Sequence, residues 1–124
     1  MPAWKFYLRE AKKYEDDHRA HIPLFNKKRI QQFTKRVCEY YDVVTPEITY
    51  RGRTYHRCIW EPPRLNFIEG HITLGLFCHE IAHHVENQLN DNRRHDTRLA
   101  KRIEEVLGWL YTEVLEKRDK FGMK

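Results

Sequence analysis

The segment GLFCHEIAHHVENQ, residues 75–88, is the most informative part of this sequence. Its apolar residues recur at the three- and four-residue spacing of a helix that packs into a core. Residues 79–86 nevertheless carry three imidazoles and two carboxylates. Burying such polar groups costs free energy unless another interaction compensates for the lost hydration. A divalent metal would compensate, so the stretch predicts a metal site on a buried helix.

His79, Glu80 and His83 form the pattern HExxH. Residues four apart lie on one face of a helix, so both imidazoles can bind one zinc ion. Glu80 projects about 100° further round, where its carboxylate can accept a proton from a water on that metal. This arrangement indicates hydrolysis, most often of a peptide bond. The alternative interpretation is that the histidines are hydrogen-bonded within a wall of the core.

A catalytic zinc site usually has a third protein ligand. The metzincin pattern fails, because Glu86 and Leu89 stand where that pattern requires glycine and histidine. His95, Glu104 and Glu105 are the remaining candidates. The polar run NDNRR is long enough to return His95 to the metal. Projection of the next helix places His95 beside the buried face and the two glutamates more than about 100° away, which favours His95.

Two interpretations remain open for some residues near the HExxH pattern. His84 lies about 100° beyond His83 and is expected at the core edge or on the surface. Asp96 either orients a ligand imidazole or caps the following helix. A donor that stabilises the transition-state oxyanion is needed as well, and the sequence does not choose among Tyr55, His56, Tyr111 and several arginines.

Hydrophobic periodicity predicts the order of elements. Two N-terminal helices are expected, then three short β-rich runs, then two more helices. The ranges are 3–14, 26–41, 46–50, 54–60, 64–68, 71–89 and 95–116. This order predicts a single α+β domain over residues 1–124, in which the helix after the strands packs on the sheet.

Composition fits that interpretation. The chain has 124 residues, 40% of them hydrophobic and 13% aromatic, enough for one core. No apolar run of about 18 residues and no secretory signal is visible, so we expect a cytoplasmic protein without a membrane span. Cys38, Cys58 and Cys78 are odd in number and widely spaced, which favours reduced core thiols over disulfides.

The formal net charge of +5 leaves a second function open. The chain could be a basic module that binds nucleic acid or an acidic protein and has a structural or vestigial zinc site. Its basic residues would be Arg93, Arg94, Arg98, Lys101 and Arg102. HExxH favours the enzyme, because a structural site does not need a base beside the metal.

The segment CHEIAHHVENQLNDNRRHDTRL, residues 78–99, preceded by RLNFIEG, residues 64–70, resembles the SprT-like zincin metalloproteases. The resemblance covers roughly residues 46–110 and implies a minimal zincin-like domain with a small three-stranded sheet. It implies a zinc ion on His79, His83 and His95, Glu80 as general base, and a peptide or protein substrate lying along the strand at 54–60. Asp96 departs from the family, which often has glycine after the third histidine.

Overall fold

The computed structural model describes residues 17–24, 26–51, 58–61, 63–68, 70 and 72–120. Helices and strands are mixed along the chain, which is compatible with the predicted α+β class. The elements are η1 (His18–His21), α2 (Lys27–Tyr41), β1 (Glu47–Thr49), β2 (Cys58–Glu61), β3 (Arg64–Phe67), α3 (Leu74–Asn90) and α4 (Thr97–Lys120). The helix expected at residues 3–14 and most of the run expected at 54–60 lie outside the described residues.

The helix predicted at residues 26–41 is α2, and local interactions define both of its ends. The side chain of Asn26 accepts hydrogen bonds from the backbone N–H groups of Lys28 and Arg29, as an N-cap does. Asp42 ends the helix in the left-handed conformation, with φ of 54°. The buried residues of α2, spaced three and four apart, are Ile30, Phe33, Thr34, Val37 and Cys38.

The sheet has the order β1-β3-β2. β1 runs parallel to β3, and β2 runs antiparallel to β3 and forms an edge of the sheet. Asn66 ties β3 to the end of β1, because its side chain accepts hydrogen bonds from Thr49 Oγ1 at 2.7 Å and from the N–H of Arg51 at 2.9 Å. Leu65 and Phe67 of β3 are fully buried. The Phe67 ring stacks on that of Phe77 on α3, with the ring centroids 6.0 Å apart.

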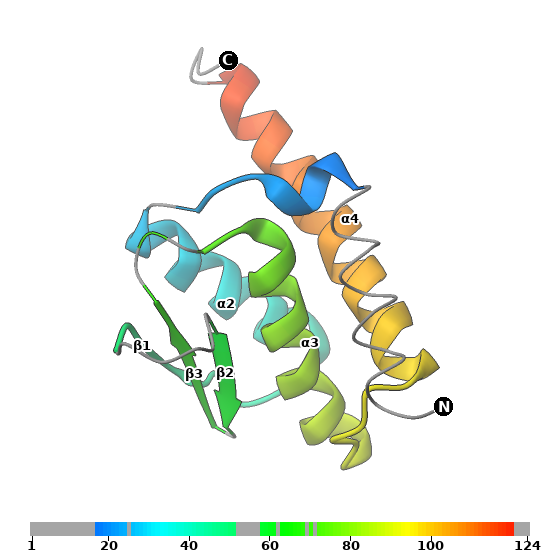
Figure 1. Ribbon diagram of the computed structural model, residues 1–124. Coiled ribbons are helices and arrows are strands. Elements are labelled where there is room, and N and C mark those ends of the chain that lie inside the picture. Colours follow the sequence, from blue (N-terminus) through cyan, green and yellow to red (C-terminus); the bar gives the residue numbers. More distant parts are fainter. Residues whose placement is uncertain are drawn as a thin grey trace.

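Helix α3 lies in the middle of the molecule, between the sheet and α4, with α2 behind it (Figure 1). All of its residues from Leu74 to Glu86 except Leu76 are buried. Thr73 caps the helix, since its hydroxyl oxygen accepts the N–H of Leu76, so α3 begins three residues later than the sequence suggested. Gly75 permits a close approach of η1, whose Ala20 lies directly against it.

Helix α4 packs beside α3 along much of its length (Figure 1). It begins at Thr97 rather than at His95, because the carboxylate of Asp96 accepts the N–H of Leu99 at 3.0 Å. The predicted apolar stripe of Leu99, Ile103, Val106, Leu107, Leu110 and Val114 is buried, as expected. Among the helices that the structure describes, none combines the length and the apolar character that crossing a bilayer requires.

Candidate metal centre

Three histidines from two segments meet between α3 and the start of α4. His79 and His83 stand one turn apart on α3, and their Nε2 atoms are 3.1 Å apart. His95, from the turn after α3, places its Nε2 atom 3.1 Å from that of His83. One ring nitrogen from each residue lies within 4.8 Å of the other two. These three side chains could therefore hold a metal ion.

The turn that carries His95 is defined by its own polar contacts. Asp91 ends α3 in the left-handed conformation, with φ of 50°, and turns the chain back toward α4. The side-chain amide of Asn92 donates to Asp96 Oδ1 at 3.3 Å, so these two residues bracket His95. Asp96 thus acts as the cap of α4, one of the two roles that the sequence allowed.

Glu80 lies beside the histidine cluster rather than within it. Its Oε1 atom is 3.8 Å from His79 Nε2, and only 9% of the residue is exposed. A carboxylate this close to the imidazole nitrogens can reach a small molecule bound at the same nitrogens and exchange a proton with it.

Burial keeps the His83 imidazole in the form that a metal requires. His83 is 4% exposed, and burial together with the neighbouring His79 and His95 lowers its pKa from 6.5 to about 3. Its imidazole is therefore neutral at physiological pH. Only a neutral imidazole has a free lone pair for a metal, so no proton has to be removed from His83 before binding.

Trp60 forms a wall of the site that the sequence did not indicate. Its indole stacks on the His83 imidazole, with the ring centroids 5.3 Å apart and the planes inclined by 11°. Within the described residues, His83 Nδ1 has no hydrogen-bond partner, although a ligand histidine usually donates from this second nitrogen. Stacking on Trp60 therefore restrains the orientation of the ring. No local pattern marks Trp60, because β2 and α3 are separate in sequence.

The glutamates considered as third ligands are exposed. Glu104 and Glu105 both lie on the solvent side of α4, as the projection predicted, and Glu105 interacts with Tyr41 and Arg102.

Of the two positions expected for His84, the core edge and the surface, the surface is wrong. The residue is 0% exposed, and its Nε2 donates to the carbonyl oxygen of Val44 at 2.6 Å. The segment after α2 covers this face of α3, which helical projection of α3 alone cannot reveal.

Of the candidate oxyanion donors, Tyr55 and His56 lie outside the described residues. Tyr111 lies against η1, where its hydroxyl group is 3.3 Å from His18 Nε2. Cys38 and Cys78 are free, buried thiols, as predicted, and the side chain of Cys58 lies outside the described part.

The set of residues proposed for an acidic partner has to be corrected. Arg102 is not available to such a partner, because it forms an ion pair with the buried Glu86 at 3.4 Å and lies over the Tyr41 ring. The exposed basic residues near His95 are Arg93, Arg94, Arg98 and Lys101.

Comparison with known proteins gives no family assignment. No family model, no curated protein and no solved structure matches this chain.

Proposed function

We propose that this protein is a zinc-dependent metallopeptidase, with His79, His83 and His95 as the metal ligands and Glu80 as the general base. The observation that carries the proposal is the convergence of three buried or half-buried imidazoles on one point with a buried carboxylate beside them. The resemblance of residues 64–70 and 78–99 to SprT-like zincins supports the same assignment.

The donor set fits zinc. Zinc binds histidine nitrogen at about 2.05 Å, so two ligand nitrogens around a tetrahedral ion stand about 3.35 Å apart. The Nε2 atoms of His79 and His95 each lie 3.1 Å from that of His83, close to this separation. Three protein ligands are typical of catalytic zinc sites, whereas structural sites usually have four.

Each residue then has a defined role. When bound, zinc would lower the pKa of water toward neutrality and polarise a carbonyl group. Glu80 would accept the proton from the attacking water at a carboxylate oxygen and deliver it to the amine nitrogen of the leaving group. The Trp60 indole would hold the His83 ring, and the cap formed by Asp96 would hold the turn that carries His95.

The placement of β2 fits an extended substrate. β2 is an edge strand, so one of its sides has no strand beside it in the described sheet. An extended peptide can hydrogen-bond to such an edge. Trp60 of β2 stacks on His83, which would bring a peptide bound along this strand close to the histidines and Glu80.

The proposal is tested with the purified wild type, Glu80→Gln and the matched control Glu104→Gln, which changes an exposed carboxylate. Metal analysis should give about one zinc per chain in all three proteins, because neither carboxylate is a ligand. In a peptide-library assay, Glu80→Gln should lose activity by a factor on the order of 10² to 10⁴, while Glu104→Gln keeps it. Equal cleavage by Glu80→Gln and wild type would refute the role of Glu80.

The alternative of a basic binding module is less well supported. Arg102 is paired with Glu86 and is not available to an acidic partner, and a binding module does not explain the buried carboxylate of Glu80. Salt-dependent binding of an oligonucleotide by the chain, without peptide cleavage by the zinc-loaded protein, would favour the module.

A further inference from the structure

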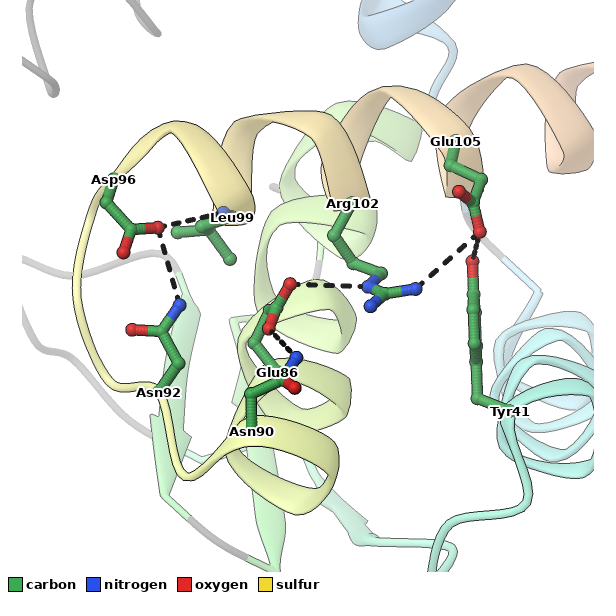
Figure 2. A network of polar contacts seen from close by, with 8 residues as sticks. All are labelled: Tyr41, Glu86, Asn90, Asn92, Asp96, Leu99, Arg102 and Glu105. Atoms are coloured by element: carbon green, nitrogen blue, oxygen red, sulfur yellow. Dashed lines mark hydrogen bonds and ion pairs between the residues drawn. The ribbon is translucent and has the colours of Figure 1, made fainter.

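A second polar cluster, built around the buried carboxylate of Glu86, joins α3 to α4. Glu86 of α3 is 1% exposed, and its Oε1 atom lies 3.4 Å from Arg102 Nε of α4. Its other oxygen, Oε2, accepts a hydrogen bond from Asn90 Nδ2 at 2.6 Å. Figure 2 shows the Glu86 and Arg102 side chains reaching toward each other across the space between the two helices.

The Arg102 guanidinium is held from several sides. It lies over the Tyr41 ring, with Cζ 4.7 Å from the ring centroid, and its Nη1 atom is 3.7 Å from Glu105 Oε1. Tyr41 donates its hydroxyl proton to the same Glu105 carboxylate. Contacts from α2, α3 and α4 thus fix one side chain of α4 (Figure 2).

The position of the ion pair relates it to the metal ligands. Glu86 is seven residues after His79, so at about 100° per residue it lies on the face of α3 that presents the ligand histidines. Arg102 is seven residues after His95. The ion pair therefore joins the first and last residues of segment 86–102, and His95 lies between them in the sequence.

Stability alone does not account for this arrangement. A buried ion pair contributes little net stability compared with apolar residues of the same size, because both charges lose their hydration. Its geometry is restrictive, however, since a displaced partner leaves an uncompensated charge in the interior. Within the described residues, Arg102 Nε and Glu86 Oε1 make no hydrogen bond, so each depends on the other.

We propose that Glu86 and Arg102 are positioning residues that hold α4 against α3 so that His95 Nε2 stays within ligand distance of His83 Nε2. This inference rests on the ligand set of the proposed function but not on peptide hydrolysis. Loss of the ion pair would let the start of α4 move and would weaken the contribution of His95 to metal binding.

The first experiment measures the zinc affinity of Glu86→Gln by competition with a chromophoric chelator. The affinity is measured at a temperature at which circular dichroism shows that every variant is folded. Global unfolding therefore does not contribute to the measured affinity. The matched control is Glu104→Gln, which changes an exposed carboxylate of α4 outside this cluster. We expect at least a tenfold loss of affinity for Glu86→Gln and less than a twofold change for Glu104→Gln.

A double-mutant cycle with His95→Ala separates positioning from a general effect on the fold. If Glu86 acts through His95, Glu86→Gln should change the zinc affinity of the His95→Ala protein by less than twofold. An equal tenfold loss in both backgrounds would overturn the inference. If Glu86→Gln does not fold, Arg102→Lys enters the same cycle, because lysine keeps the charge but not the planar geometry of arginine.

The outcomes for the two proposals are distinguishable. The effects of Glu86→Gln and His95→Ala on zinc affinity could be non-additive while the zinc-loaded protein cleaves no peptide. That result would overturn the proposed peptidase and support the positioning role. An additive cycle in a protein that cleaves peptides would overturn the positioning role alone.

Discussion

The contact between η1 and α3 provides a direct test of how the helix with the HExxH pattern is held. Gly75 lies in the first turn of α3. A Cβ added there would lie 2.6 Å from the Cβ of Ala20 and 3.1 Å from the Cα and the carbonyl oxygen of Ala20. Two of these three atoms belong to the backbone, so the Gly75→Ala variant must displace η1 from α3.

The expected magnitude follows from two opposing terms. Overpacking of this kind costs about 3 kcal/mol, the upper end of the usual range, because backbone has to move. Alanine is preferred over glycine within a helix by about 1 kcal/mol. Gly75→Ala should therefore lower the free energy of unfolding by about 2 kcal/mol.

Gly108 on α4 offers a matched control. A Cβ added there meets only Arg19 Nη1, at 3.8 Å, an ordinary van der Waals distance. Gly108→Ala should gain up to about 1 kcal/mol from helix propensity alone. The two substitutions are chemically identical, so their difference of about 3 kcal/mol measures the steric term.

Urea denaturation in the presence of a chelator measures these values without a contribution from bound metal. Ala20→Gly in the Gly75→Ala background should restore part of the loss, because it removes the 2.6 Å contact. If Gly75→Ala and Gly108→Ala change the free energy of unfolding by the same amount, α3 does not pack on η1 through Gly75.

Two further predictions concern the metal ligands. His95→Ala should weaken zinc affinity by orders of magnitude, whereas Glu104→Ala and Glu105→Ala leave it nearly unchanged in the same chelator competition; the opposite ranking would move the third ligand to a glutamate. In metal-free protein, the free energy of unfolding should decrease as the pH falls from about 6.5 toward about 3, because His83 takes up a proton in the unfolded state before it does in the folded state. His83 contributes at most about 1.4 kcal/mol per pH unit to the dependence of the unfolding free energy on pH. Urea titrations at several pH values should show that His83→Gln lacks this contribution.

The features that depend on helix geometry could be predicted from the sequence. The periodicity of residues 26–41 and 95–116 predicted α2 and most of α4, because burial of one face follows from spacing along a single helix. The HExxH spacing placed His79 and His83 together for the same reason, since residues four apart always lie on one face. The exposure of Glu104 and Glu105 followed from the same projection.

Contacts between elements that are distant in the sequence could not be predicted and became known from the folded chain. His95 was one of several reachable ligands until the turn bracketed by Asn92 and Asp96 placed its Nε2 atom 3.1 Å from that of His83. His84 is buried because the segment containing Val44 covers it, which no property of α3 reveals.

The same holds for Trp60 and for the pairing of Glu86 with Arg102, because each joins two elements whose relative placement is set by the packing of the whole core. Helix geometry is fixed by hydrogen bonds between residues four apart, and the sequence displays that spacing directly. The distance between two helices depends instead on every side chain packed between them, so the ligand from the second segment and the ion pair that flanks it can be found only in the folded chain.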